Sequence, residues 1–426
     1  MHGQVDTLLL ISGILLLADF YLIGAVRAGL KKWKFVHKPA FIRLYWGFSI
    51  LLICGIMISV FARAGLGFRS VFLAAFFLQL LGKLFFLPFV ITDDTRRLII
   101  WFKRKRNNKI SIPAKTESNP NAIPRSEFLM KAGLLAGSVP LAALTYGTIS
   151  GVYDYRIKHQ KLYLPNLPKA FDGIRLGQIS DIHSGSFYNK KAVAGGVEML
   201  LKEKPDFIFF TGDLVNERTS EMRDYQDIFT KIKAPLGVYS SLGNHDYGDY
   251  YNWDSWEDRR RNFEDMIQTH KNLGWDLLRN ENRRLKVGGE EIGILGVENW
   301  GTISRFGKRG RLDLAVKNTD DLPVKLLLSH DPSHWRAKVL DYPDIDVMFA
   351  GHTHGMQFGI RTKQFQWSPI QYIYNEWAGL YRERNQQLYV NVGYGFLGYP
   401  GRVGILPEIT IFELKASPDP SLQKGA

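Results

Sequence analysis

Four long apolar runs in the first third of the chain constrain its fold more than any other feature. Two of them, residues 44–62 and 132–152, contain no Asp, Glu, Lys or Arg over 19 and 21 positions. The other two, residues 5–24 and 70–90, are as long but carry a few ionisable side chains. Because a helix needs about 20 mainly apolar residues to cross a bilayer, residues 1–152 are predicted to form an all-α transmembrane region of about four helices.

The basic residues between these runs predict an orientation in the membrane. Six Lys or Arg lie in residues 25–43 and nine in residues 91–125, but only Arg63 and Arg69 lie between the second and third runs. Since cytoplasmic loops carry an excess of Lys and Arg, the two basic loops are predicted to be cytoplasmic. We therefore expect a multi-pass protein of the cell membrane whose residues after 152 lie outside the cytoplasm.

Two features of the membrane region have alternative interpretations. Asp19 and Lys83 fall at a similar depth in their runs, so either they form an ion pair or Lys83 reaches the interface alone. Residues 124–131 resemble a twin-arginine export signal but have one arginine where that signal needs two. Residues 125–150 are accordingly either a degenerate export signal or a plain transmembrane helix.

The basic excess of the chain belongs to this membrane region. The chain has 55 Lys and Arg against 41 Asp and Glu, and residues 1–150 hold 19 of the former and 6 of the latter. The remainder is nearly neutral, whereas a nucleic-acid-binding domain is expected to carry its own basic stripe. We therefore expect no nucleic-acid partner. The single cysteine, Cys54, excludes an intrachain disulfide and a cysteine-based zinc site.

The rest of the chain is predicted to contain a linker at 153–171, one α/β domain at 172–415 and a disordered tail at 416–426. In the domain, short apolar runs typical of buried strands are interspersed with helical stretches. The predicted strands are 174–180, 206–211, 237–242, 284–287, 292–297, 325–328, 346–350, 388–392 and 409–414, and the predicted helices are 190–202, 222–232 and 259–273. This order indicates a sheet-rich α/β domain with helices outside.

Side chains that can bind metals follow five of the predicted strands. The five motifs are Asp181-Ile182-His183, Gly212-Asp213, Gly243-Asn244-His245-Asp246, Ser329-His330-Asp331 and Gly351-His352-Thr353-His354. Each motif alone is a common sequence with a high false-positive rate. Ligand and catalytic groups of α/β sheets gather beyond the carboxyl ends of the strands, and clustered His and Asp gain nothing structurally without a cation. The series as a whole therefore predicts a metal site.

The types of ligand indicate the chemistry of that site. Carboxylate, imidazole and amide groups without sulfur suit Mn²⁺, Fe or Zn²⁺. Two divalent ions about 3.5–4 Å apart need a bridging carboxylate and can hold an activated hydroxide that attacks a phosphate ester. No Ser or Cys nucleophile is then required, and a histidine that binds no metal can protonate the departing alkoxide.

The same motifs resemble the calcineurin-like metallophosphoesterase family over roughly residues 172–414. The surrounding sequence is similar to a bacterial branch with a membrane anchor or export signal, and the shared features are Leu167-Pro168, Phe171-Asp172-Gly173 and Pro407-Glu408-Ile409. The resemblance implies a two-sheet sandwich flanked by helices. It also implies these roles: Asp181, His183 and His354 at one metal, Asn244, His330 and His352 at the other, Asp213 bridging the two, His245 near the leaving group, and Asp246 as an orienting residue.

Together these features predict a membrane-anchored phosphoesterase with two divalent metal ions. Its expected substrate is a phosphomonoester, phosphodiester or pyrophosphate, with lipid-linked or envelope phosphates favoured by the membrane anchor. Two alternatives stay open. One is a membrane sensor that binds metal or phosphate without turnover, and the other is a cytoplasmic-facing enzyme similar to the relatives that cleave UDP-diacylglucosamine. The sequence indicates no oligomeric state.

Three segments near the motifs have open roles. The aromatic-rich segments 247–261 and 364–381 each follow a metal-bearing loop, so they form either a cap over the substrate or ordinary loop packing. The Gly/Arg segment 305–311 either contacts phosphate or is a solvated loop. His159, His270 and His334 fall outside the motifs and are expected to be surface or core residues.

Overall fold

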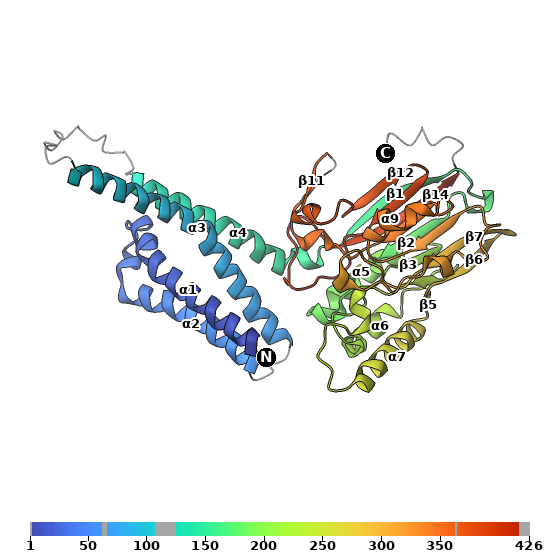
Figure 1. Cartoon of the computed structure of the whole chain (residues 1–426), viewed down its shortest axis with the longest axis horizontal. Helices are drawn as coiled ribbons and strands as arrows, with labels where there is room; N and C mark the ends of the chain where they lie inside the picture. The colour runs from blue at the N-terminus through green and yellow to red at the C-terminus, as the bar shows by residue number, and fades with distance from the viewer. Residues whose placement is uncertain (1, 62–65, 107–124, 363, 417–426) are drawn as a thin grey trace. The chain divides into compact units, whose positions relative to one another are not determined.

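The chain divides into two compact units, Met1–Tyr146 and Gly147–Ala426. The computed structural model describes residues 2–61, 66–106, 125–362 and 364–416 (Figure 1). Each unit is described by itself below.

The first unit is built from long helices. They are α1 (His2–Gly29), α2 (Pro39–Phe61), α3 (Leu66–Arg106) and α4 (Arg125–Ile149), with a short 3₁₀ turn at Lys34–His37. All four are long and apolar enough to cross a membrane, and only 17–22% of their most apolar windows is buried inside the protein. Side chains such as Leu17 and Phe20 are more than two-thirds exposed, as expected for helices that face lipid rather than water.

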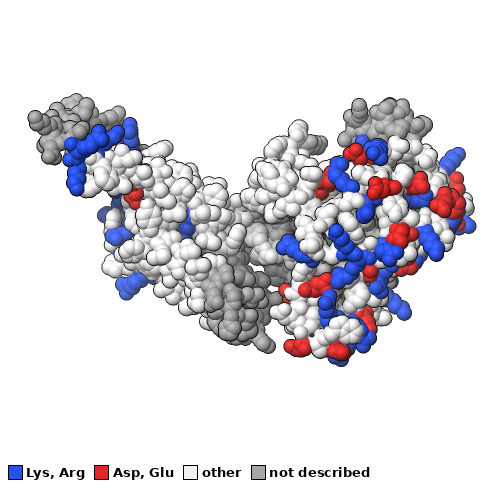
Figure 2. Space-filling model, in the orientation of Figure 1, with Lys and Arg blue, Asp and Glu red and all other residues white. Residues whose placement is uncertain are grey.

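The third helix is longer than predicted. The run at 70–90 was expected to end near residue 90, but α3 continues to Arg106 and has 41 residues, or ~60 Å. That is about twice the hydrocarbon thickness of a bilayer. The sequence after residue 90 becomes charged but contains no Gly or Pro until residue 113, so nothing in it ends the helix. Figure 2 shows Lys and Arg side chains gathered where α3 ends and α4 begins.

The proposed ion pair within the membrane unit is confirmed. Lys83 Nζ lies 2.7 Å from Asp19 Oδ1, and the Asp19 side chain is fully buried. An ionisable group in a membrane span usually finds such a partner. The alternative, in which Lys83 reaches the interface alone, is therefore wrong.

The second unit is an α/β sandwich. One six-stranded sheet has the order β1-β14-β2-β3-β4-β5 and the other has the order β12-β13-β9-β8-β7-β6, while β10 and β11 form a separate ribbon. The strands are β1 (Arg156–Leu164), β2 (Arg175–Ile179), β3 (Phe207–Phe210), β4 (Val238–Ser240), β5 (Asp276–Leu277), β6 (Glu281–Val287), β7 (Glu290–Gly296), β8 (Lys325–Leu328), β9 (Val347–Ala350), β10 (Ile360–Arg361), β11 (Gln366–Trp367), β12 (Gly379–Glu383), β13 (Gln386–Val390) and β14 (Glu408–Ala416).

Alternating side chains of the strands explain the layers. In β3, Phe207 and Phe209 join the core between the sheets, whereas Ile208 and Phe210 join the core under the outer helices. Such alternation follows from the two-residue period of a strand. The helices are α5 (Lys190–Lys202), α6 (Gln226–Phe229) and α7 (Trp256–Leu273) on the first sheet, and α8 (Leu312–Ala315) and α9 (Ser333–Ala337) on the second. The predicted two-sheet sandwich flanked by helices, preceded by four apolar helices, is confirmed.

Three details differ from the sequence-based expectation. The predicted linker 153–171 contains β1, a mostly polar strand that pairs with β14 along nine residues. An edge strand is held by main-chain hydrogen bonds and needs no apolar run, so the search for apolar runs missed it. The predicted helix 222–232 is instead a 3₁₀ segment followed by α6. The predicted tail begins at residue 416, which still belongs to β14, and residues 417–426 lie outside the described residues.

Candidate metal centre

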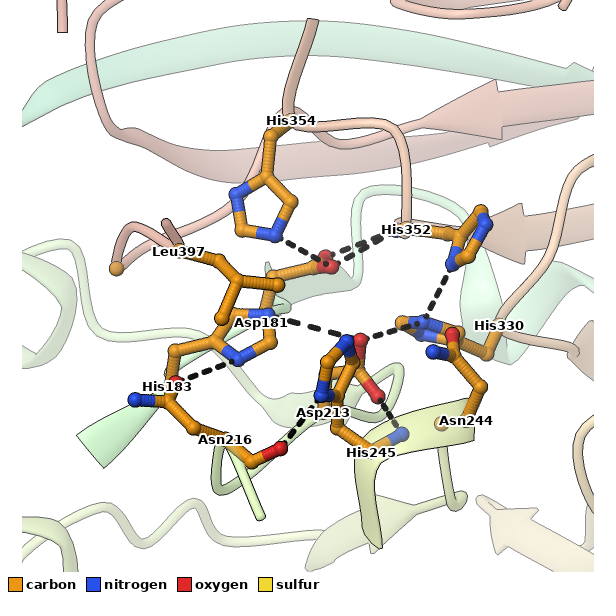
Figure 3. A network of polar contacts seen from close by, with 12 residues as sticks. Asp181, His183, Asp213, Asn216, Asn244, His245, His330, His352, His354 and Leu397 are labelled. Atoms are coloured by element: carbon orange, nitrogen blue, oxygen red, sulfur yellow. Dashed lines mark hydrogen bonds and ion pairs between the residues drawn. The ribbon is translucent and has the colours of Figure 1, made fainter. Parts of the chain in front are cut away.

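The five motifs lie at the carboxyl ends of five strands. β2, β3 and β4 are parallel neighbours in the first sheet, and β8 and β9 are parallel neighbours in the second. The loops after these strands therefore meet at one end of the sandwich. Figure 3 shows the motif side chains converging there from both sheets.

The backbone of these loops is strained at the motif residues. Left-handed φ values occur at five of the seven predicted ligands, namely Asp181, His183, Asp213, His352 and His354, with φ between 49° and 71°. A left-handed conformation costs a non-glycine residue roughly 1–2 kcal/mol, and such strain concentrates at functional sites. Gly243 shows how tight the packing is, because a Cβ at this position would collide with the Asp213 carboxylate.

One group of ligands consists of Asp181, His183 and His354. Their ligand atoms all lie within 4.8 Å of one another, and all three residues are buried. His354 Nε2 is 3.2 Å from Asp181 Oδ1. The loop after β2 thus supplies two side chains and the loop after β9 supplies the third.

A second group consists of Asp213, His330 and His352, again with ligand atoms within 4.8 Å of one another. His330 Nε2 is 3.0 Å from Asp213 Oδ2 and 3.3 Å from His352 Nδ1. Asn244 points toward this group beside His330 (Figure 3). The structure therefore brings together all the side chains that the resemblance assigned to the second metal.

Asp213 connects the two groups. Its Oδ2 lies 3.0 Å from His330 Nε2 in the second group and 3.6 Å from His183 Nε2 in the first. Asp181 also contacts both groups, but it reaches the second only through the backbone N–H of His352, whereas Asp213 lies beside histidine rings of both. A single carboxylate in this position can bridge two cations.

Hydrogen bonds behind the ligands fix which atom each one offers. His330 Nδ1 donates to the Thr211 carbonyl at 2.7 Å, so Nε2 is the ring nitrogen that faces Asp213 and the centre. His183 Nδ1 lies 3.1 Å from Asn216 Oδ1, which has the same effect on its Nε2. Outer hydrogen bonds of this kind orient metal ligands and raise their basicity.

Two tyrosines hold the remaining ligands of the second group. Asn244 Nδ2 donates to the Tyr250 hydroxyl at 2.9 Å, which turns Asn244 Oδ1 toward the centre. The Tyr374 hydroxyl lies 2.9 Å from His352 Nε2 and donates to Asp331 at 3.3 Å. These contacts come from the two aromatic segments, 247–261 and 364–381, whose tyrosines thus position the ligands.

Unpaired buried atoms show that the residues fit cations. His183 Nε2 and Asn244 Oδ1 are buried without a hydrogen-bond partner, and the buried His354 Nε2 has only Asp181 Oδ1 beside it, at 3.2 Å. A buried polar atom without a partner costs roughly 1–3 kcal/mol, and these three are the atoms that face the centre. Nitrogen and oxygen donors without sulfur match divalent transition metals. The side chains therefore fit two divalent ions.

The charges at the centre also favour cations. Burial lowers the pKa values of His183 and His352, so both imidazoles are neutral and can bind metal. Burial works to raise the pKa of Asp181, but the nearby His354 and His330 outweigh it and keep this carboxyl ionised. Burial likewise opposes ionisation of Asp213, and the surrounding histidines outweigh it and lower its pKa. Two buried carboxylates thus stay anionic at neutral pH.

His245 lies beside the centre without joining either group. Its Nδ1 donates to the Asn216 carbonyl at 2.5 Å, and its backbone N–H donates to Asp213 Oδ1 at 2.8 Å. The ring packs against Tyr250 and His183 and borders a cavity of about 360 Å³. Nε2 is therefore the atom left for proton transfer.

The expected role of Asp246 as the residue that orients His245 is wrong. Its carboxylate accepts backbone hydrogen bonds at 2.8–2.9 Å from Asp213, Leu214 and Gly243, whereas His245 is oriented by the Asn216 carbonyl. Burial and the neighbouring Asp213 raise the pKa of Asp246 to about 7. Asp246 is thus a positioning residue that ties the loop after β3 to the loop after β4.

Sequence reasoning missed two other positioning residues. Asn216 follows Asp213 by three residues, and this spacing could have indicated it. Arg402 had no such signal: it is buried and reaches His354 Nδ1 at 3.2 Å from a loop between β13 and β14. The three histidines outside the motifs behave as expected, since His270 and His334 are core residues and His159 is exposed and paired with Glu203.

Two protein families match the chain. The family described as "Probable Calcineurin-like phosphoesterase, transmembrane domain" matches residues 6–152, and the family described as "Calcineurin-like phosphoesterase" matches residues 174–356. The matched segments correspond to the helical unit and to most of the sandwich that carries the five motifs.

Several curated relatives and a solved structure are similar to parts of the chain. A "Transmembrane protein with metallophosphoesterase domain" of Danio rerio is 26% identical over 71% of this chain and 66% of its own length. The "Uncharacterized metallophosphoesterase YkuE" of Bacillus subtilis is 27% identical over 66% of this chain and 95% of its own length. The chain thus spans just under two-thirds of the zebrafish protein. The NAD nucleotidase of Haemophilus influenzae superposes with a TM-score of 0.35 at 16% identity, over 52% of this chain and 45% of its own.

The two family matches together cover most of the chain, and both relatives are described as metallophosphoesterases, the zebrafish one also as a transmembrane protein. The structure contains two clusters of His and Asp side chains that could each hold a metal ion. The chain belongs to the calcineurin-like phosphoesterase family, as a multi-pass membrane member with a four-helix transmembrane domain.

Proposed function

We propose that this protein is a dinuclear metallophosphoesterase that hydrolyses phosphomonoester, phosphodiester or pyrophosphate bonds. The observation that carries the proposal is the position of Asp213, whose Oδ2 lies 3.0 Å from a histidine of one ligand group and 3.6 Å from a histidine of the other. A carboxylate shared in this way is what a two-metal hydrolytic site requires.

The ligand atoms divide into two sets around that carboxylate. Asp181, His183 and His354 would hold one divalent ion, and Asn244, His330 and His352 would hold the other, with Asp213 common to both. When bound, Mn²⁺, Fe or Zn²⁺ supplies an activated water as nucleophile and stabilises charge on the phosphoryl oxygens. Hydrogen bonds of the ligands to Thr211, Asn216, Tyr250 and Tyr374 hold the ligands in orientation before any ion arrives.

His245 supplies the proton for the leaving group. Its Nδ1–H is fixed on the Asn216 carbonyl, so a proton on Nε2 faces the cavity. A positioned general acid of this kind typically contributes about 10²–10⁴-fold to the rate. Water is consumed in the reaction, the ester P–O bond breaks, and the alkoxide leaves as an alcohol with the proton from His245.

We place the sandwich on the extracytoplasmic side. The two strongly basic loops, 25–43 and 91–125, belong in the cytoplasm by the positive-inside rule. A phosphatase reporter fused after residue 416 tests this orientation. A reporter at the same position that shows activity only in the cytoplasm would contradict the orientation. That result would favour a cytoplasmic substrate such as UDP-diacylglucosamine.

The activity is tested with the full chain in detergent and bis(4-nitrophenyl) phosphate as substrate, with Mn²⁺ present. The wild type is expected to hydrolyse it, and Asp213→Asn is expected to lose the activity. His159→Ala is a matched control, because this exposed histidine contacts Glu203 far from the motifs in sequence. No hydrolysis by wild-type protein that contains two metal ions per chain would overturn the proposal and favour a sensor.

A further inference from the structure

The cavity beside the metal centre has both polar and apolar lining residues. It measures about 360 Å³ and is lined by residues of the centre, including Asp213, His245 and His354. Six apolar side chains also line it, and we call them the apolar wall: Ile303, Phe306, Met356, Ile370, Ile373 and Leu397. A ligand in this cavity thus meets both candidate metal ligands and hydrocarbon.

Two residues of the apolar wall, Met356 and Ile373, also belong to a set of exposed apolar side chains that we call the apolar rim. The side chains of the rim are 38–77% exposed, and they are Met356, Phe358, Ile360, Phe365, Tyr372 and Ile373. Among described residues 155–416, these are six of the ten exposed large hydrophobic side chains. Figure 2 shows the lobe around β11 almost without charged side chains, whereas the face over β5 to β7 carries many of both signs.

A positively charged side chain lines the same cavity. Arg305 borders the cavity and stacks on Phe306, with its guanidinium carbon 4.7 Å from the ring centroid. It forms no ion pair with a carboxylate among the described residues. An unpaired guanidinium at this place is suited to a phosphate oxygen.

The sandwich follows the membrane helices directly along the chain. Only six residues, 150–155, separate the end of α4 from the start of β1. A soluble enzyme rarely exposes a contiguous apolar patch beside its active site unless the patch binds something, and aromatic side chains such as Phe365 and Tyr372 are typical of the membrane interface.

We propose that the substrate is a membrane lipid with a phosphoester headgroup. This inference rests on the proposed function and deepens it by naming the class of substrate. The phosphate lies at the metal centre with one oxygen on Arg305, and the hydrocarbon part lies along the apolar wall while the rim contacts the bilayer. Hydrolysis adds water across the ester P–O bond and gives a phosphate product and an alcohol, with the alcohol proton supplied by His245.

The test compares two esters that differ only in their apolar part. The full chain with Mn²⁺ is assayed in one kind of mixed micelle on 4-nitrophenyl methyl phosphate and on 4-nitrophenyl hexadecyl phosphate. The expected kcat/KM is at least about tenfold higher for the hexadecyl ester, because its alkyl chain is transferred from water to the apolar wall on binding. Ile373→Ser combined with Met356→Ser is expected to lower that ratio by about fivefold or more. Leu314→Ser, an exposed leucine of α8 outside the rim, is the matched control and is expected to keep the ratio.

Each outcome decides between the proposals. Equal kcat/KM for both esters would overturn the lipid substrate and leave the phosphoesterase intact, whereas no turnover of either ester would overturn both. An unchanged ratio in the rim variant, with a shift from dimer to monomer, would show that the rim binds a second copy of the chain and would overturn the proposal. Arg305→Gln is expected to lose about tenfold in kcat/KM on both esters, and an unchanged value would remove Arg305 from the substrate site.

Discussion

Replacing His245 by alanine gives the sharpest test of the proposed proton transfer. The His245 side chain contacts no metal ligand through a donor atom, and its Nδ1 is occupied by the Asn216 carbonyl. The substitution therefore removes a proton donor while leaving the ligand atoms of Asp181, His183 and Asp213 in place. Loss of a general acid costs about 10²–10⁴-fold, which corresponds to roughly 3–5 kcal/mol of transition-state stabilisation.

The size of the loss depends on the leaving group. An alkoxide needs a proton as it departs, so His245→Ala is expected to lower kcat by about 10²–10⁴-fold on a dialkyl phosphate. A 4-nitrophenolate leaves without protonation, so the loss on the nitrophenyl ester is expected to be much smaller. The assay measures kcat on both esters with Mn²⁺, together with the metal content of each protein. His159→Ala serves as the control.

Two results would refute this reasoning. Equal losses on the alkyl and the nitrophenyl ester would show that His245 does not act on the leaving group. A fall in metal content in His245→Ala would show that the residue supports the metal centre instead of donating a proton.

Four further predictions follow from individual contacts. Asp246→Asn removes an acceptor for buried backbone N–H groups of the β3 and β4 loops, each worth about 1–3 kcal/mol; thermal unfolding should start at a lower temperature, and an unchanged Tm would refute the role. Tyr374→Phe removes the partner of His352 Nε2 and should weaken metal binding about 10–100-fold in a chelator competition; unchanged affinity would contradict it. Lys83→Leu leaves Asp19 without its ion-pair partner and should lower the stability of the protein by about 3–5 kcal/mol. The double variant Lys83→Leu with Asp19→Leu should have a higher Tm in detergent than Lys83→Leu alone, and equal Tm values for both variants would argue against the pair. Burial lowers the pKa of His270 to about 3, so below about pH 6.5 the unfolded chain binds a proton that the folded chain does not. The stability of the folded chain therefore falls as the pH falls, by up to about 1.4 kcal/mol per pH unit. His270→Phe should flatten the fall in Tm between pH 7 and pH 5, and an unchanged slope would contradict this.

The parts of the fold that could be predicted from sequence are those with a strong local signal. The apolar runs predicted four helices because lipid-facing helices must be apolar on all sides, and β8 and α5 were predicted within their observed bounds, Lys325–Leu328 and Lys190–Lys202. Strand β1 escaped because its side chains are mostly polar and its pairing with β14 joins residues about 250 positions apart. The charged extension of α3 was not predicted, because a polar stretch of helix contains no apolar run that would mark it.

The candidate site divides in the same way. Its ligand residues could be predicted because each follows a strand as a short polar motif. The contacts behind them could not, since they depend on how distant loops pack. Tyr374 reaches His352 from 22 residues away, and Arg402 reaches His354 from 48 residues away. Asp246 shows the limit of local reasoning, because it neighbours His245 in sequence but binds backbone N–H groups of another loop.

The metal content of the purified chain tests the central proposal most directly. The full chain is loaded with Mn²⁺ in detergent, freed of unbound metal and analysed by elemental mass spectrometry alongside Asp213→Asn. Because one carboxylate is shared by two groups of ligands, we expect about two ions per chain in the wild type and a clear loss in the variant. A wild-type chain that hydrolyses phosphoesters with one ion or none, or an Asp213→Asn chain that keeps both ions, would contradict the shared centre.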